Sequence, residues 1–148
     1  MMHVSSRLVC AVFCITKNKS NMLEKGLTHT SRIIVGTCDT AIAFGSGDMP
    51  VLATPRMVAL LENAAMMAVT HVLPADSTTV GGHIDVSHIK PSAVGTIVNG
   101  TATLDKIDGR KLYFTVRAVD KDGTVVGEGT HLRFIVDREK FMDRLPER

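Results

Sequence analysis

Apolar residues recur at helical spacing between Val51 and Leu73, in the segment "VLATPRMVALLENAAMMAVTHVL". This pattern predicts one long helix with a wide apolar stripe and a narrow polar side. Thr54 is a favourable N-cap, Pro55 suits the first helical position, and Pro74 ends the run. Since the stripe takes up most of the circumference, we expect this helix to be buried on nearly all sides.

The rest of the chain has the alternation and the β-branched residues of strands, separated by turn signals. The predicted strands are residues 31–44 with a bend at Gly36, His83–Ile89, Gly95–Ile107, Lys111–Asp120 and Thr124–Asp137. Residues 74–82 are rich in turn formers and are expected to form a loop. Two Asp-Gly pairs, Asp108-Gly109 and Asp122-Gly123, predict tight hairpins. The pattern indicates an α+β domain, in which an antiparallel sheet of about five strands wraps one helix.

Length and charge narrow the range of functions. The chain has 148 residues, the size of one ordinary domain, and a formal net charge of +2 with acids and bases mixed along it. With no basic face and with one Tyr and no Trp, the composition does not favour nucleic acid as a partner. Cys10, Cys14 and Cys38 are odd in number and lack zinc-site spacing, which favours a reduced, cytoplasmic protein without a metal site.

The first residues, "MMHVSSRLVCAVFCITKNKSN", contain a short apolar run that no small-residue cleavage site follows. The run is too short to span a bilayer, which needs roughly 20 apolar residues, so we do not expect a membrane partner. We interpret residues 1–21 as an extension to a domain formed by residues 22–148, with Met22 as a plausible alternative start. An additional edge strand or a packed helix remains the alternative.

One carboxylate stands out on the predicted helix. At about 100° per residue, Glu62 projects close to Val58 and Val69, at the edge of the apolar stripe, rather than with Asn63. It is either a boundary residue that reaches solvent, Arg56 or a sheet lysine, or a partly desolvated carboxylate. A desolvated carboxylate is costly unless it is paired, and is for that reason a candidate functional group.

The segment "VGGHIDVSHIKP" offers further polar candidates. As a strand it places His83, Asp85 and Ser87 on one face and His88 on the other, among the apolar positions. The two histidines therefore do not favour a metal site, and no nucleophile-elbow pattern supports a serine hydrolase. By itself, His88 is either a core histidine or a functional one. The preceding Gly81-Gly82 pair permits close approach of a ligand or another backbone, or completes a turn.

Four separated elements together resemble the fluoroacetyl-CoA thioesterase-like branch of the hotdog-fold thioesterases. They are Thr54, Glu62 within the same helix, His88 after "GGHIDVSH", and "GEGTHLRFIVDREKF" near the C-terminus. The likeness covers roughly Thr30 to Leu145 and includes "AT" before the helix and "VALLENA" within it. Their order and spacing, rather than any single element, carry the resemblance.

The resemblance implies a hotdog fold, with a long central helix wrapped by a curved sheet. It also implies a homodimer, or a higher homo-oligomer, whose active sites lie at the subunit interface. The catalytic Thr, Glu and His of the family fall on Thr54, Glu62 and His88, and the glycine near the thioester carbonyl falls on Gly81. The reaction would be hydrolysis of an acyl-CoA thioester, with coenzyme A as part of the substrate and no separate cofactor.

The chemistry of these residues suits such a reaction. Glu62 would activate water or attack the carbonyl itself, and His88 would carry protons near neutrality. Thr54 and the backbone N–H groups of Gly81 and Gly82 would orient the carboxylate or polarise the carbonyl. The residues leave open which of Glu62 and His88 acts as the base. Arg133 would contact the pantetheine or phosphates of the carrier, or else form a salt bridge on the strand surface.

One segment departs from the pattern of the family. The member that handles fluoroacetyl-CoA carries a phenylalanine-bearing lid before the helix, whereas "FGSGDMPVLATP" has no aromatic residue besides Phe44. We therefore expect short or medium acyl-CoA substrates rather than fluoroacetyl-CoA. The alternative function is a non-catalytic module that binds an acyl thioester or a small apolar ligand. Glu62 discriminates between the enzyme and the binding module, because a protein that only binds has little reason to keep a carboxylate on a buried helix edge.

Overall fold

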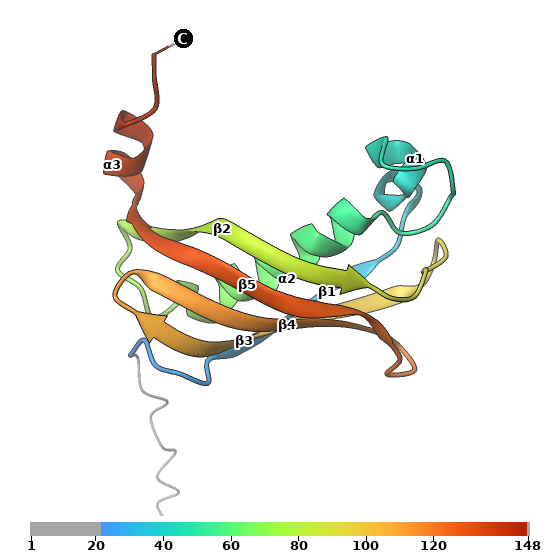
Figure 1. The fold of residues 1–148 in the computed structure, drawn as a ribbon, viewed down its shortest axis with the longest axis horizontal. Coiled ribbons are helices and arrows are strands. Elements are labelled where there is room, and N and C mark those ends of the chain that lie inside the picture. The colour runs from blue at the N-terminus through green and yellow to red at the C-terminus, as the bar shows by residue number, and fades with distance from the viewer. Residues whose placement is uncertain (1–21, 148) are drawn as a thin grey trace, which may run out of the picture.

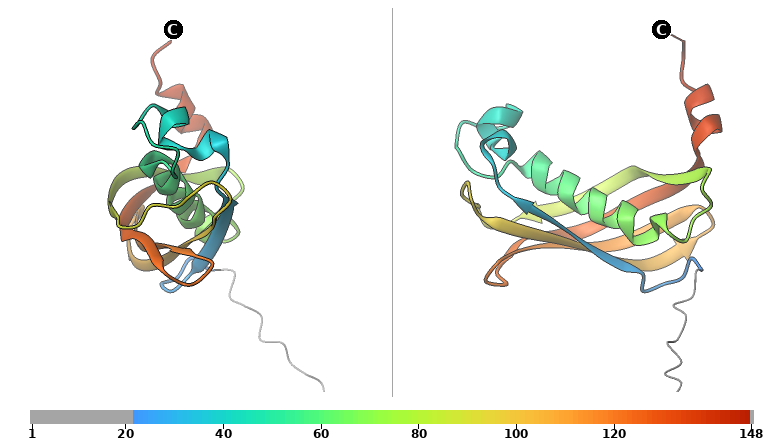
Figure 2. Two further views of the ribbon diagram at one scale, coloured as in Figure 1. Left: turned by 90° about the vertical axis from the view of Figure 1, so that its right-hand side faces the viewer. Right: turned by 180° about the vertical axis from the view of Figure 1, so that it is seen from behind.

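One long helix, α2 (Thr54–Thr70), lies in the curve of a five-stranded antiparallel sheet (Figures 1 and 2). The computed structural model describes residues 22–147. Its strands are β1 (Thr28–Ile34), β2 (Ser77–His88), β3 (Ile97–Asp108), β4 (Lys111–Asp120) and β5 (Val125–Asp137). The sheet order is β1-β3-β4-β5-β2, so β2 occupies one edge and β1 the other. The predicted α+β architecture is confirmed.

Helix α2 supplies much of the core. Its buried residues are Met57, Leu60, Leu61, Ala64, Ala65, Ala68 and Val69. They pack with buried residues of the sheet: Val98, Ala102, Leu104, Leu112, Phe114, Val116, Ala118 and Val126. The apolar stripe thus faces the concave side of the sheet as expected, and this burial is the main source of the stability of the helix. The helix is not buried on nearly all sides within one chain, because Ala59, Asn63, Met67 and Thr70 form an exposed stripe. No helix among residues 22–147 is long and apolar enough to cross a membrane.

The two Asp-Gly hairpins form where the sequence predicts them, between β3 and β4 and between β4 and β5. Gly109 and Gly123 adopt positive φ angles of 57° and 78°, a conformation that side-chain-bearing residues rarely adopt. These tight connections fix the register of the three central strands.

The first predicted strand is too long. Strand β1 ends at Ile34, and the residues after Gly36 form a 3-10 turn, η1 (Thr37–Asp39), and a short helix, α1 (Ala41–Phe44). Asp39 explains the change: its Oδ2 accepts the Gly36 N–H at 2.8 Å and its Oδ1 accepts from Arg56 Nε at 2.7 Å. These bonds hold the chain in a turn and anchor it to α2.

Residues 77–82 were predicted as loop and instead form the first half of β2. They pair with the C-terminal half of β5, from Ser77 opposite Asp137 to Gly81 opposite Arg133. This partner is far away in sequence, so a local pattern cannot reveal it. The short helix α3 (Arg138–Asp143) was also not predicted, although Asp137 caps it by accepting the Lys140 N–H at 2.9 Å.

Thr54 is not the N-cap of α2. Ala53 takes that position with extended backbone angles and no side-chain cap bond, and Thr54 is the first helical residue. Pro55 then takes the second position, where the N–H it lacks would have had no partner within the helix. The consequence is that the Thr54 hydroxyl is not used for capping.

Candidate active site

The freed hydroxyl of Thr54 bonds to His88, the last residue of β2. Thr54 Oγ1 lies 2.8 Å from His88 Nδ1, which joins the first turn of α2 to the end of the edge strand. The other ring nitrogen of His88, Nε2, is buried and has no hydrogen-bond partner among the described residues. A buried polar atom without a partner is rare, and at a candidate site it marks a nitrogen available for substrate or water. We call these two residues the Thr54–His88 pair.

A pocket of about 300 Å³ opens beside the Thr54–His88 pair. Besides these two residues it is lined by Ala41, Ser46, Val51, Leu52, Ile89 and Pro91. Most of these side chains are small or apolar, and the volume is at the lower end of the range for small-molecule sites. Phe44, the one aromatic residue in the segment before the helix, ends α1 with 46% of its surface exposed and does not line this pocket.

His88 is suited to exchange protons from a neutral state. Burial disfavours the imidazolium and lowers the pKa of His88, while the nearby backbone of Lys90 acts in the opposite direction. The ring is thus neutral at neutral pH, with one nitrogen able to accept a proton and the other able to donate one. The hydrogen bond to Thr54 fixes the ring orientation.

Glu62 lies elsewhere in the same chain, beside Gly81 in the middle of β2. A Cβ atom on Gly81 would be 3.3 Å from both Glu62 Oε1 and His131 Cε1 and 3.6 Å from Arg133 Nη1. Arg56, one of the partners considered for Glu62, pairs with Asp39 instead. The half-buried Glu62 therefore faces a group of polar residues inside the sheet, the second of the two environments considered from the sequence.

The polar residues around Glu62 are fully bonded. Arg133, 6% exposed, donates from Nε to Thr79 Oγ1 and from Nη2 to the Thr79 carbonyl, each at 2.8 Å. Its Nη1 lies 3.1 Å from His131 Nε2, and since a guanidinium only donates, His131 must accept there. His131 Nδ1 is then the protonated nitrogen and donates to the His83 carbonyl at 2.8 Å.

The charges of this group fit a neutral His131 beside a charged arginine. Burial is the main cause that lowers the pKa of His131, and the neighbouring Arg133 adds to it. Burial also lowers the pKa of Arg133, and the carboxylate of Glu62 opposes that shift. We call Glu62, Thr79, Gly81, His131 and Arg133 the Glu62 cluster.

Arg133 was considered as a contact for the carrier or as a surface ion pair. Its burial and its bonds to Thr79 and His131 do not fit a surface ion pair. Substrate contact by Arg133, Gly81 and Gly82 stays a prediction. His131 shares a strand face with Arg133 and was expected to make structural hydrogen bonds, which the structure shows. The role of Thr79 in holding Arg133 was missed, because no local pattern pointed to it.

A β-bulge at Gly82 brings the two halves of β2 onto one face. The pairing with β5 shifts between Gly81 and His83, so that Thr79 and Gly81 before the bulge and Ile84, Val86 and His88 after it all face α2. Without the extra residue, the odd separation of Gly81 and His88 would place them on opposite faces. The predicted division of His83, Asp85 and Ser87 from His88 is confirmed by the alternating exposure of these residues.

The Thr54–His88 pair and the Glu62 cluster do not meet within one chain. Glu62 is eight residues from Thr54 on α2, about 12 Å along the helix axis. Gly81 is seven residues from His88 on β2, about 20 Å along the strand. Within one chain, the Thr54–His88 pair and the Glu62 cluster therefore lie apart on a common face and do not form one triad.

Comparisons with known proteins agree with this architecture. A family model described as fluoroacetyl-CoA-specific thioesterase matches residues 35–139. The fluoroacetyl-CoA thioesterase of Streptantibioticus cattleyicolor is 36% identical over 91 residues, which are 62% of this chain and 65% of that protein. The match thus spans slightly less than two thirds of the relative.

Solved structures extend the similarity to most of the domain. A threonine-to-serine mutant of the fluoroacetyl-CoA thioesterase FlK in complex with acetyl-CoA is 28% identical, with a TM-score of 0.77 over 82% of this chain and 96% of that one. A hot-dog-like protein from Thermanaerovibrio acidaminovorans is 22% identical, with a TM-score of 0.71 over 84% of this chain and 94% of that one. The fold is the hotdog fold, and the chain belongs to the fluoroacetyl-CoA-specific thioesterase family.

Proposed function

We propose that this protein hydrolyses short or medium acyl-CoA thioesters in a site assembled from Thr54, Glu62 and His88 across a homodimer. The observation that carries the proposal is the Thr54–His88 hydrogen bond, which leaves His88 Nε2 buried and without a partner among the described residues. Family membership supports the reaction, and a relative crystallised with acetyl-CoA supports the substrate class.

The open edge of β2 supports the dimer. A free strand edge presents unpaired N–H and C=O groups, which pairing with a second copy would satisfy. Antiparallel self-pairing about a two-fold axis at Asp85 would set Ile84 opposite the partner's Val86 and, because Gly82 is the extra residue of the bulge, His88 opposite the partner's Gly81. In that register the Thr54–His88 pair of one subunit would meet the Glu62 cluster of the other.

The assembled residues would divide the chemistry of thioester hydrolysis. Glu62 would accept a proton from water as the water oxygen attacks the carbonyl carbon. The oxyanion would be stabilised by backbone N–H groups near Gly81 and by the Thr54–His88 pair. As the C–S bond breaks, a proton returns to the thiolate through His88. Thr54 orients the imidazole.

The acyl group would occupy the pocket beside the Thr54–His88 pair. Its apolar lining and volume of about 300 Å³ suit a short or medium chain. Because Phe44 does not line it, we do not expect selective recognition of a fluoromethyl group. The ratio of kcat/KM for fluoroacetyl-CoA to that for acetyl-CoA measures this directly.

Release of free thiol from a panel of acyl-CoA esters, from acetyl to octanoyl, tests the function. We expect turnover by the wild type and a loss of about 10²- to 10⁴-fold in kcat for Glu62→Gln, with smaller losses for His88→Ala and Thr54→Ala. Each variant is compared with the wild type in thermal unfolding, so that loss of fold is separated from loss of chemistry. If the wild type binds these esters and cleaves none, the protein is the non-catalytic binding module instead.

A further inference from the structure

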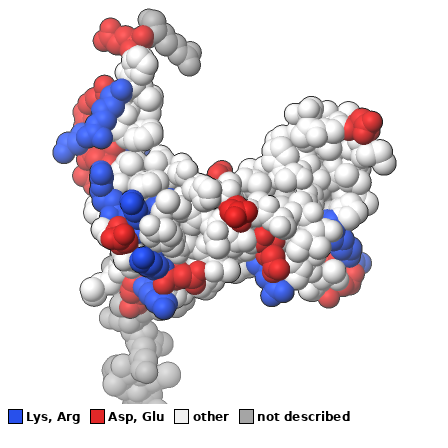
Figure 3. Space-filling model, in the orientation of Figure 1, with Lys and Arg blue, Asp and Glu red and all other residues white. Residues whose placement is uncertain are grey.

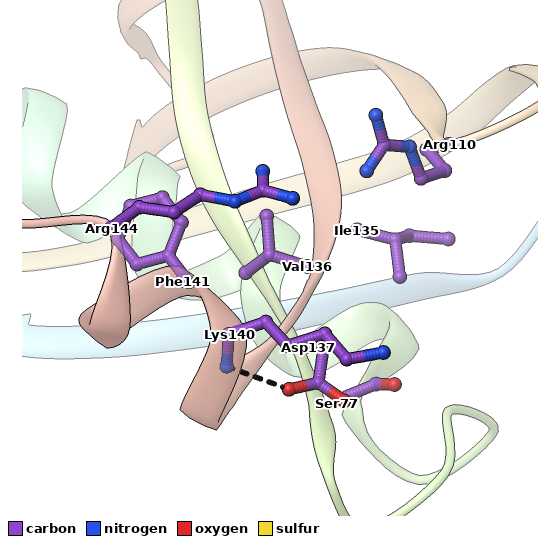
Figure 4. A pocket seen from close by; sticks show the side chains of 8 residues that line it. All are labelled: Ser77, Arg110, Ile135, Val136, Asp137, Lys140, Phe141 and Arg144. Atoms are coloured by element: carbon purple, nitrogen blue, oxygen red, sulfur yellow. Dashed lines mark hydrogen bonds between the residues drawn. The ribbon is translucent and has the colours of Figure 1, made fainter.

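A second pocket, of about 380 Å³, lies at the opposite end of β2 from the Thr54–His88 pair (Figure 4). It is bounded by the start of β2, the end of β5, helix α3 and the β3–β4 hairpin. Ile135, Val136 and Phe141 give it an apolar floor and wall, while Arg110, Lys140 and Arg144 bring cationic groups to it. The proposed reaction uses none of these residues.

Cationic groups outnumber carboxylates in the lining of this pocket, which we call the α3 pocket. Arg110, Lys140 and Arg144 make no ion pair within residues 22–147. The one carboxylate in the lining, Asp137, accepts the backbone N–H of Lys140 as the cap of α3. The two acids of α3 itself, Glu139 and Asp143, do not line the pocket. Figure 3 shows Lys and Arg side chains over α3 and the adjoining end of the sheet, with Asp and Glu side chains among them.

The α3 pocket and the Glu62 cluster are reached by residues of the same face of the sheet, further along β2 and β5. The paired residues Gly81 and Arg133, Thr79 and Ile135, and Ser77 and Asp137 follow one another on the face that carries α2. From Gly81 to Ser77 the distance is about 13 Å along β2. An extended pantetheine arm can cover this distance.

We propose that the α3 pocket binds the phosphate groups at the far end of the pantetheine arm of the substrate, an inference that rests on the proposed function. Guanidinium groups match phosphate oxygens in a two-pronged geometry, and a lysine adds a point charge. The ring of Phe141, 39% exposed, offers a face on which an adenine base can stack. The α3 pocket would thus bind the phosphates of the carrier while the thioester lies near Gly81, about 13 Å away along β2.

Substitutions that replace charged side chains by neutral ones, with a matched control, test whether the α3 pocket binds phosphate. The variant Arg110→Gln/Arg144→Gln removes two charges that line it. The control Lys111→Gln/Arg138→Gln removes two charges from adjacent positions that do not. KM and kcat are measured for acetyl-CoA, acetyl-phosphopantetheine and acetyl-pantetheine, which carry the full nucleotide, a single phosphate and none.

We expect KM for acetyl-CoA to rise about tenfold or more in Arg110→Gln/Arg144→Gln, with kcat within about twofold of the wild type. KM for acetyl-pantetheine should not change, and the control variant should behave as the wild type. Phe141→Ala should raise KM for acetyl-CoA but not for acetyl-phosphopantetheine if the base stacks there. An equal response to Phe141→Ala with both esters would assign the pocket to the phosphopantetheine of a carrier protein.

Direct binding of free coenzyme A, measured by calorimetry, separates this proposal from the proposed function. One outcome is that no thioester is cleaved but Arg110→Gln/Arg144→Gln weakens coenzyme A binding about tenfold relative to the control. The assignment of the α3 pocket is then supported, and the proposed hydrolase function is wrong. If thioesters are cleaved and both variants keep the wild-type KM and affinity, the α3 pocket is not the phosphate site. If the double variant does not fold, the single variant Arg144→Gln, at an exposed position, is tested for the same changes in KM and coenzyme A affinity.

Discussion

The Thr54–His88 pair and the Glu62 cluster lie on the same face of α2 and β2 but differ in how fully their polar groups are bonded. In the cluster, Arg133 and His131 satisfy each other, Thr79 and a backbone carbonyl. In the pair, one hydrogen bond orients the histidine and leaves Nε2 without a partner among the described residues. The cluster is a rigid support that positions a carboxylate, whereas the pair is open to a ligand.

This difference explains why neither region is a complete site. The Glu62 cluster has a carboxylate near the buried positive charge of Arg133, and none of its residues lines the pocket beside the Thr54–His88 pair. The Thr54–His88 pair has a pocket and a proton-exchanging group but no carboxylate beside it. Each has what the other lacks, which is the arrangement expected when two subunits share one site.

The largest expected effect comes from combining two inactive subunits. Glu62→Gln and His88→Ala chains are produced together with different affinity tags, and the heterodimer is isolated. If each site takes Glu62 from one chain and His88 from the other, one of two sites is intact, and activity should be about half that of the wild type. Each variant alone should be at least about 100-fold less active.

The matched control combines Thr54→Ala with His88→Ala. Because these two residues are hydrogen-bonded within one chain, both sites of that heterodimer carry a defect and activity should stay low. Restored activity in the control, or none in the Glu62→Gln heterodimer, would contradict the division of the site between subunits.

Local sequence patterns were enough for the main elements but not for the surroundings of Glu62. The helix and the two Asp-Gly hairpins depend on neighbours within a few residues, and they form as predicted. Glu62 meets Gly81, His131 and Arg133, which only the pairing of β2 with β5 brings together. Thr54 was assigned as a cap because the local pattern allowed it, yet its hydroxyl bonds a residue 34 positions away.

The bulge at Gly82 was beyond sequence reasoning for the same reason. Two adjacent glycines are compatible with a turn, a bulge or a close approach. In the structure the ring of Phe134 on β5 packs against Gly82. A Cβ atom on Gly82 would lie 2.2 Å from Phe134 Cε2 and 2.7 Å from Phe134 Cδ2. Glycine is thus required here by packing, and the bulge it permits sets both regions on one face.

Gly82→Ala should therefore disturb both regions through the strand between them. We expect a loss of about 1–3 kcal/mol in the free energy of unfolding, typical of overpacking, together with lower kcat. Urea unfolding and thiol release measure the two effects. Adding Phe134→Leu makes room for the new methyl group and should restore most of the stability; no recovery would mean that another contact requires the glycine.

The smallest expected effect is on pH dependence, and it again separates the two regions. Since burial lowers the pKa of His88, its neutral form persists to lower pH than that of an ordinary histidine, whose pKa is about 6.5. If neutral His88 is the active form, kcat/KM should be flat above that pH and fall only in more acidic solution. The free energy of unfolding should change in the same direction. Below about pH 6.5, His88 takes up a proton in the unfolded chain but not in the folded one, so the free energy of unfolding decreases as the pH falls.

His88→Asn tests this assignment, because it keeps a polar group but cannot titrate. The residual kcat/KM of this variant should no longer fall in acidic solution. Its free energy of unfolding should decrease less between pH 7 and pH 5 than that of the wild type, and the decrease that remains should come from His131, whose pKa is also lowered. An unchanged acidic fall in the variant would move the titration to Glu62 or His131, within the Glu62 cluster. Proton transfer would then be assigned to the Glu62 cluster rather than to the Thr54–His88 pair.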